Sequence, residues 1–196
     1  MHRSLTIAAC AALAVAAAAL PTPATAQSGG WTTLFNGSSL DGWRVLGTAN
    51  WQLGDGAVSA TSGSGFLVSD RSYDDFELSV EVWADEPANS GVFMRCANPQ
   101  VIADRNCYEV NIYDTRPDQA YRTGGIVHIA SPSAQINAAG RWNTFLIRAE
   151  GTRLVVTMNG TQTVDTTNNL FASGPFALQY AAGTVRFRNV RIRSLD

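Results

Sequence analysis

Two stretches of the sequence place a glutamate among apolar residues in the alternating pattern of a β-strand. In "NCYEVNIYD", Glu109 and Asn111 point to the face opposite the apolar row, because side chains alternate along a strand. In "FELSVEVWAD", Glu81 and Trp83 do the same. A carboxylate that lines a cleft is a candidate general acid or base, whereas one on a solvated face has no chemical role. Whether these carboxylates line a cleft or lie on a solvated face depends on the elements around the two strands.

The chain after residue 26 consists of short strands separated by turn residues, with no long stretch of helical period. "RLVVTMNGTQTVD" places Asn159-Gly160 between two runs, which is a strong hairpin signal. In "TVRFRNVRIRSL" the arginines alternate with apolar residues, as on the outer face of a strand. About a dozen such strands predict an all-β fold, a β-sandwich or jelly roll. Sandwiches of this kind often curve, and sugars can bind on the concave face.

The first 26 residues have the features of a secretory signal peptide. Arg3 gives a basic start, an uncharged Ala-rich run extends from Leu5 to Leu20, and Ala24-Thr25-Ala26 fits a small-x-small cleavage site. The run is too short to favour a retained membrane anchor. Lipoprotein attachment at Cys10 is an alternative, but it leaves almost no apolar segment ahead of the cysteine. We therefore expect an exported protein, periplasmic or extracellular, cleaved after Ala26, with one domain over residues 27–196.

The composition gives no electrostatic reason to expect nucleic acid or an anionic membrane surface as a partner. All 14 basic residues are arginines, and there are 16 acidic residues. Loss of Arg3 leaves 13 arginines against those 16 acids, a net charge of −3 for the mature chain. A mildly acidic and evenly mixed surface does not attract polyanions.

Two cysteines remain after the signal peptide, at the ends of "CANPQVIADRNC". In an exported protein, a single pair at the two ends of a loop is most simply a disulfide, here between Cys96 and Cys107. Closing such a short loop should stabilise the fold by about 3 kcal/mol in the chain-entropy picture. A catalytic thiol is the alternative, which an oxidising compartment disfavours, and zinc needs more ligands than this spacing offers.

Several stretches in order resemble one family of carbohydrate-active proteins. They are "WTTLFNGSSLDGW", "FELSVEVWADEPANSGVFMRC", "YEVNIYD", "TGGIVHIASP", "GRWNTFLIRAEGTRLVVTMNG" and "GPFALQYAAGTVRFRNVRIRSL". Together they resemble the 3-keto-disaccharide hydrolase domain, also described as a 3-keto-glucoside 1,2-lyase and 3-keto-2-hydroxy-glucal hydratase domain. The resemblance extends from Trp31 to Leu195. It implies the concanavalin A-like jelly-roll β-sandwich.

The resemblance also implies a reaction. The substrate would be a glycoside that a separate oxidoreductase has already oxidised at C3, so that this protein needs no nicotinamide. The ketone makes the C2 hydrogen acidic, the C1 substituent leaves by β-elimination, and water then adds back to give the free 3-keto sugar. This chemistry requires a base near C2, a group that stabilises charge on the C3 oxygen, and an acid for the leaving oxygen.

The resemblance suggests roles for a small set of residues. Glu109 occupies the place of the family's strand glutamate and is the first candidate for base or acid, with Glu81 and His128 as further catalytic candidates. His128 is the only histidine after the signal peptide, and an ordinary pKa of about 6.5 suits proton transfer. The candidates for substrate binding are Arg95, Trp83, Asn89 and Asn111. A divalent metal is possible, but no ligand set is evident.

Each of these residues also has a structural interpretation. Glu81 or Glu109 could pair with Arg95 in a salt bridge, His128 could serve as a hydrogen-bonding histidine, and Trp83 could pack. Two histidines typical of the family are missing, at Val156-Thr157 and within Tyr180–Ala182. A non-catalytic carbohydrate-binding module of the same fold is therefore the alternative function, and an envelope scaffold that kept only the fold is a third.

Overall fold

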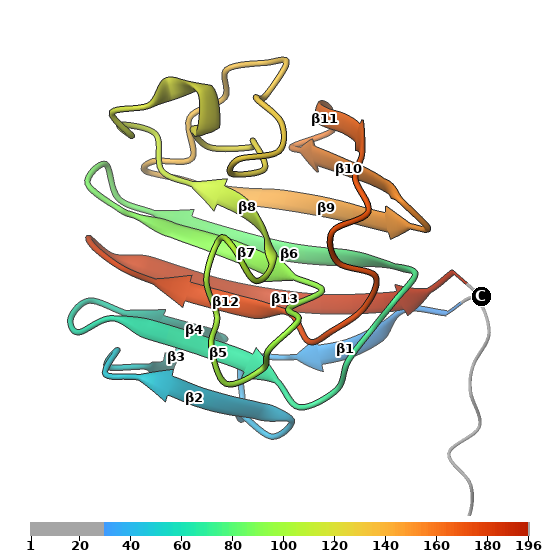
Figure 1. Ribbon diagram of the computed structural model, residues 1–196. Helices are drawn as coiled ribbons and strands as arrows, with labels where there is room; N and C mark the ends of the chain where they lie inside the picture. Colours follow the sequence, from blue (N-terminus) through green and yellow to red (C-terminus); the bar gives the residue numbers. More distant parts are fainter. Residues whose placement is uncertain (1–29, 196) are drawn as a thin grey trace, which may run out of the picture.

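The computed structural model describes residues 30–195, which form two antiparallel β-sheets packed face to face (Figure 1). The predicted signal peptide lies outside the described residues. The large sheet has the strand order β11-β10-β9-β6-β13-β4-β3, and β1 also pairs with β13. Its strands are β1 (Thr32–Phe35), β3 (Gln52–Gly54), β4 (Ala57–Ala60), β6 (Phe76–Ala84), β9 (Trp142–Glu150), β10 (Arg153–Met158), β11 (Thr161–Thr167) and β13 (Val185–Ser194).

The small sheet has the order β2-β5-β12-β7-β8. Its strands are β2 (Trp43–Gly47), β5 (Gly65–Ser69), β7 (Ser90–Met94), β8 (Tyr108–Ile112) and β12 (Ala177–Tyr180). A single 3₁₀ turn, η1 (Gln119–Tyr121), lies in the segment between β8 and β9. Among the described residues no helix is long and apolar enough to cross a membrane. This arrangement confirms the predicted all-β jelly-roll sandwich.

The core lies between the two sheets and follows the alternation in the sequence. On β6 the inward residues run from Phe76 to Val82, and on β8 the inward residues run from Tyr108 to Ile112; all are buried in one cluster. Removing apolar area from water stabilises a fold by about 25 cal/mol per Å², so burial of this shared cluster is the main stabilising contribution. The same alternation turns Glu81 and Glu109 away from the core, each on the outer face of its own sheet.

Two local signals in the sequence take the geometry that their residue types favour. Asn159 and Gly160 have positive φ values of 50° and 80° in the turn between β10 and β11, as a primed hairpin turn requires. In β13 the register shifts between Arg188 and Arg191, with Asn189 at a φ of 50°. This bulge inserts an extra residue, so the arginines after it stay on the outer face of the large sheet.

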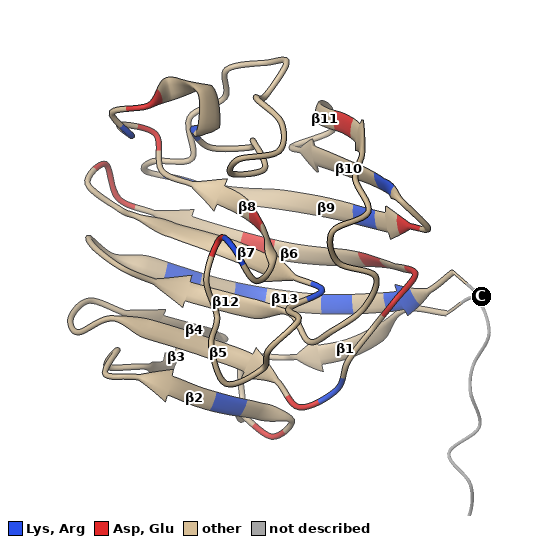
Figure 2. Cartoon of the chain, viewed as in Figure 1, with Lys and Arg blue, Asp and Glu red and all other residues tan. Residues whose placement is uncertain are grey.

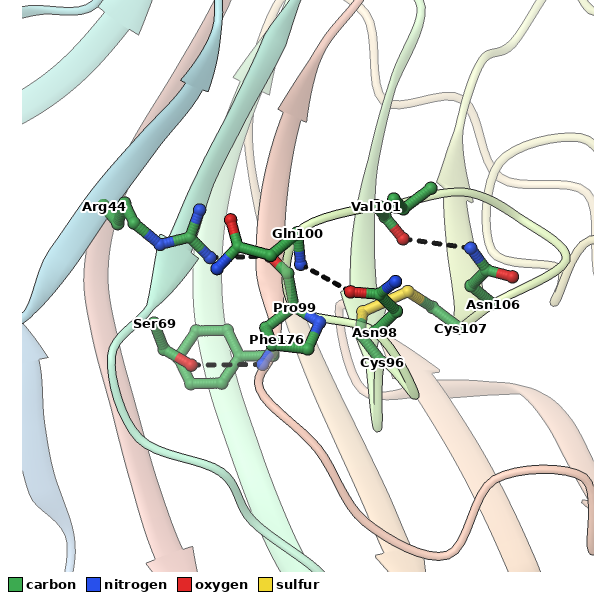
Figure 3. The surroundings of a disulfide bond; sticks show 10 residues. All are labelled: Arg44, Ser69, Cys96, Asn98, Pro99, Gln100, Val101, Asn106, Cys107 and Phe176. Atoms are coloured by element: carbon green, nitrogen blue, oxygen red, sulfur yellow. Dashed lines mark hydrogen bonds between the residues drawn. A yellow bond between two sulfur atoms is a disulfide. The ribbon is translucent and has the colours of Figure 1, made fainter.

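The predicted disulfide between Cys96 and Cys107 is confirmed (Figure 3). It closes a loop that packs against the outer face of the small sheet, where Ile102 and both cysteines join a second apolar cluster with Phe93 and Ala177. Arg44 Nη2 donates to the carbonyl of Pro99 and ties the loop to β2. The outer face of the small sheet is therefore partly covered by this loop.

Candidate functional site

The two strand glutamates that the sequence put forward lie on different sheets. Glu81 and Trp83 belong to β6 and face outward from the large sheet, where acidic and basic residues follow neighbouring strands (Figure 2). Glu109 belongs to β8 and faces outward from the small sheet. The expectation that both carboxylates contribute to one site is therefore wrong, because the packed core separates the two outer faces.

Glu81 is engaged by cationic and amide neighbours. It accepts hydrogen bonds from Arg188 Nε at 2.7 Å and from Asn189 Nδ2 at 2.8 Å. Burial raises the pKa of Glu81, but these two hydrogen bonds outweigh it and hold the pKa below the ordinary value. Trp83 lies opposite Trp142 on β9, and the Arg188 guanidinium covers the Trp142 ring at 4.0 Å. This face is a network of ion pairs and stacked side chains.

Arg95 contacts neither of the two strand glutamates. Its side chain is only 1% exposed, and its Nη2 donates to Asp75 Oδ1 at 2.9 Å. Nε and Nη1 donate to the carbonyls of Asp74 and Gly151. The alternative interpretation, in which Arg95 pairs with Glu81 or Glu109 in a salt bridge, is therefore wrong. Arg95 links the turn before β6 to the turn between β9 and β10. Its donors are used in hydrogen bonds within the fold and are not available to a substrate.

Glu109 is in the opposite situation. The residue is only 6% exposed, and within residues 30–195 no hydrogen bond to its carboxylate contributes to its pKa. Burial is the main cause that raises its pKa to about 7, the negative charge of Asp104 adds to this, and the positive charge of Arg116 opposes it. A carboxyl group with this pKa exists in both protonation states near neutral pH, as a general acid or base must.

A glycine makes room for this carboxylate. Gly91 lies on β7, opposite Asn111 and next to the Phe93–Glu109 pair. A Cβ atom at residue 91 would lie 3.0 Å from Oε1 of Glu109 and 3.1 Å from its Cγ. The Glu109 side chain thus bends over the backbone of β7, where only a glycine leaves the space.

His128 lies beside Glu109 in the fold. Val127 N donates to the carbonyl of Glu109 at 3.0 Å, which ties the His128 segment to β8. His128 Nε2 is 2.9 Å from Asp104 Oδ2, and its ring meets the Tyr121 ring edge-on at 5.6 Å. His128 also has a φ of 63°, a conformation that non-glycine residues rarely adopt and that is common at functional sites. The structure therefore brings Glu109, Asp104 and His128 together.

The other predicted binding residues have mixed positions. Asn111 is fully buried; its Nδ2 donates to the Tyr121 carbonyl, and its Oδ1 has no hydrogen-bond partner among the described residues. Asn89 precedes β7, and its backbone forms a bridge with Ala182. Strand alternation places Asn89 on the same face as Gly91. Asn111 therefore lies on the same outer face as Glu109, and Asn89 lies on that face just before β7 begins.

Sequence reasoning did not include Asp104 and Gln179 among the candidates. Asp104 lies inside the disulfide loop, and nothing in its local sequence shows that it reaches His128, 24 residues later. Gln179 follows the core residue Leu178 on β12, so alternation alone could have placed it on the outer face. Within residues 30–195 the buried Oε1 of Gln179 has no hydrogen-bond partner.

The described residues contain no group of three or more His, Cys, Asp or Glu side chains arranged to hold a metal ion. The acidic and histidine side chains at the site are Glu109, Asp104 and His128. Their arrangement supports proton transfer: one enclosed carboxyl group with a pKa near neutrality, and one imidazole held by a second carboxylate.

The fold and this site define a jelly-roll sandwich with a candidate acid–base centre on the outer face of its small sheet. The chain belongs to the 3-keto-alpha-glucoside-1,2-lyase-like domain family, whose model matches residues 30–193. This confirms the resemblance found in the sequence. No curated protein matches the chain in sequence.

Solved structures share the fold. A protein from Parabacteroides distasonis ATCC 8503, provisionally described as a glycosyl hydrolase, superposes with a TM-score of 0.76 at 20% identity over 85% of this chain and 95% of its own. A second such protein from the same organism gives 0.71 at 23% identity over 85% and 100%. A carbohydrate binding module from Bacillus subtilis gives 0.63 at 20% identity over 78% and 96%. At these identities the similarity shows the fold alone.

Proposed function

We propose that the protein cleaves glycosides that carry a ketone at C3, by β-elimination of the C1 substituent followed by hydration. The observation that carries this proposal is Glu109, an enclosed carboxyl group with a pKa of about 7 and with no cationic hydrogen-bond partner in the part of the chain that the structure describes. Membership of the 3-keto-alpha-glucoside-1,2-lyase-like family supports the same chemistry. A base of this pKa suits a C2 hydrogen that a neighbouring ketone has made acidic.

In the proposed elimination, the Glu109 carboxylate removes the proton from C2, and the C2–H electrons form the enolate. The enolate then re-forms the C3 ketone while the bond from C1 to the leaving oxygen breaks, which leaves a double bond between C1 and C2. His128, held by Asp104, gives a proton to the leaving oxygen. Arg116 provides positive charge near Glu109, and we assign it to the enolate oxygen in place of Arg95.

In the proposed hydration, water adds its oxygen to C1, and Glu109, whose proton exchanges with solvent between the two steps, gives a proton to C2. One hydrogen of the water stays on the oxygen bonded to C1, and His128, which is now neutral, takes the other as a proton. Both residues thereby return to their starting states. The net reaction is hydrolysis, and the product is a free 3-keto sugar. A separate oxidoreductase must supply the ketone, and the disulfide is compatible with an exported protein that acts outside the cytoplasm.

The test is product formation from a panel of 3-keto-glucosides and their unoxidised parents, with and without a chelator. We expect turnover of the 3-keto forms only, together with exchange of the C2 hydrogen for deuterium in D₂O. Hydrolysis of the unoxidised parents, or cleavage without C2 exchange, would contradict elimination. The chelator arm reports whether a divalent metal assists.

A non-catalytic carbohydrate-binding module is the second candidate. The similarity to the Bacillus subtilis carbohydrate binding module and the missing histidines at Val156-Thr157 and Tyr180–Ala182 favour it. Saturable binding of a sugar with no product after long incubation of both substrate classes would select this function over the enzyme.

A further inference from the structure

The loop closed by the disulfide carries a charged group into the candidate site. Its ends are Cys96 and Cys107, and Ile102 anchors its middle in the apolar cluster on the small sheet. A tight turn follows, in which the carbonyl of Ala103 accepts from both Asn106 N and Cys107 N. Asp104 lies within this turn, three residues before the second cysteine. The covalent closure therefore holds Asp104 close to the start of β8.

Asp104 acts on both candidate catalytic residues. Its Oδ2 lies 2.9 Å from His128 Nε2 and fixes the orientation of the ring. Its negative charge is also close enough to Glu109 to disfavour the ionised form of that carboxyl group. The opposing charge comes from Arg116, in the segment after β8. A single side chain thus influences a base and an acid that lie on different parts of the chain.

We propose that Asp104 is a positioning residue that couples Glu109 to His128, and that the Cys96–Cys107 disulfide keeps it in place. This inference rests on the proposed function for its catalytic meaning. Opening the disulfide would release the turn around Ala103, let Asp104 move away from His128 and Glu109, and uncouple both partners. The site would then depend on the redox state of its surroundings, with full activity only where the disulfide persists.

The test is the titration of Glu109 followed by the ¹³C NMR signal of its side-chain carboxyl group, assigned by comparison with Glu109→Gln. The samples are the wild type, Asp104→Asn, the wild type with the disulfide reduced, and Cys96→Ala/Cys107→Ala. We expect the midpoint to fall below about 7 in the last three samples and to stay above the ordinary value of 4.5, because burial, the larger cause of the raised pKa, remains. Adding Asp104→Asn to the cysteine double variant should produce no further shift, because the loop acts through Asp104.

Asp55→Asn is the matched control, since Asp55 lies in an exposed turn of the large sheet and has a positive φ that asparagine tolerates. Its Glu109 midpoint should equal that of the wild type. An unchanged midpoint in Asp104→Asn, or a disulfide effect that adds fully to the Asp104 effect, would overturn the proposal. Near-ultraviolet circular dichroism at each step verifies that the cysteine variant is folded; if it is not, the reduced wild type and Asp104→Asn decide.

The NMR titration needs no substrate, so it separates this inference from the proposed function. If the 3-keto-glucosides are turned over, the acid limb of the kcat/KM profile should move to lower pH together with the NMR midpoint. The kcat of Asp104→Asn should also fall about tenfold or more, because His128 loses its partner. A shifted midpoint without any turnover would retain Asp104 as the positioning residue and reject the elimination chemistry.

Discussion

Glu81 and Glu109 occupy the same kind of sequence position and reach opposite electrostatic states. Each alternates with core residues on a strand and points to the outer face of a sheet. Glu81 has two donors within 2.8 Å and a side chain that is 25% exposed, and its pKa lies below the ordinary value. Glu109 has no such donor among residues 30–195, is enclosed, and has a pKa of about 7.

The difference comes from the neighbouring strands and loops rather than from the glutamate itself. On the large sheet, β6 lies beside β13, whose outer face carries a row of arginines. On the small sheet, β8 is an edge strand beside β7, which presents Gly91 and Phe93 at the corresponding places. For Glu81 on the large sheet, pairing has a greater effect on the pKa than burial has. For Glu109 on the small sheet, burial has the greatest effect on the pKa. Its enclosure and shifted pKa make Glu109 a candidate functional group, whereas the state of Glu81 follows from its hydrogen bonds to Arg188 and Asn189.

The largest expected effect comes from exchanging each carboxylate for an amide. Glu109→Gln should lower kcat on a 3-keto-glucoside by about 10³-fold or more, because it removes the proposed base while keeping the shape of the side chain. Glu81→Gln is the matched control and should leave kcat and KM unchanged. Steady-state kinetics on both variants checks this. Full activity of Glu109→Gln, or a large loss in Glu81→Gln, would reverse the assignment of the two faces.

The two faces should also contribute opposite pH dependences to stability. The raised pKa of Glu109 means that the folded state holds a proton that the unfolded state loses above about pH 4.5. The contribution of Glu109 to the free energy of unfolding is therefore fully present below pH 4.5 and is lost as the pH rises to about 7. Between pH 5 and pH 8 the loss amounts to about 2–3 kcal/mol. For Glu77 and Glu81 the pKa is lowered, so their contribution is present above about pH 4.5 and is lost as the pH falls.

Urea unfolding of the wild type, Glu109→Gln and Glu81→Gln at pH 3, 5 and 8 measures these slopes. Relative to the wild type, Glu109→Gln should gain stability between pH 5 and pH 8, and Glu81→Gln should lose less than the wild type between pH 5 and pH 3. Parallel curves for the wild type and Glu109→Gln from pH 5 to pH 8 would mean that Glu109 is not enclosed in solution.

Glu77, on the large sheet, shows how far ion pairing can compensate the effect of burial on the pKa of a carboxyl group. Its side chain is 9% exposed, and it accepts hydrogen bonds from Arg148 Nη1 at 2.7 Å and Arg193 Nε at 2.6 Å. Glu77→Gln removes this anionic partner from Arg193, whereas Arg148 keeps its ion pair with Glu150 at 2.8 Å. We expect a loss of about 1–2 kcal/mol in the free energy of unfolding and no change in kcat. A loss of activity greater than the fraction unfolded would connect the large sheet to the site.

The sequence predicted the parts of the fold that depend on local periodicity. Period-2 alternation identified β6 and β8 and the inward and outward faces of each, and Asn159-Gly160 identified a hairpin. The spacing of Cys96 and Cys107, with the expectation of export, predicted the disulfide. These features involve residues close together in the chain, so short-range sterics and patterning are sufficient to find them.

The sequence did not predict which residues share a site, because alternation gives the face of a strand but not its sheet. β6 and β8 are separated in sequence by β7, which pairs with β8 but not with β6. Arg95 continues the apparent alternation of β7, yet its φ of 51° turns the chain and sends the guanidinium to Asp75. The contact of Asp104 with His128 depends on the path of two loops, which no local pattern encodes.

The smallest expected effect tests whether the loss of pairing is enough to raise the pKa of a strand glutamate as far as that of Glu109. Arg188→Gln removes the cationic partner of Glu81 but leaves Asn189 and the exposure of the side chain to water. The free energy of unfolding should fall by less than about 1 kcal/mol, since a partly exposed ion pair contributes little. The pKa of Glu81, followed by carboxyl NMR, should rise only toward its ordinary value. A rise to near 7 would mean that lost pairing, rather than enclosure, is what sets the state of Glu109.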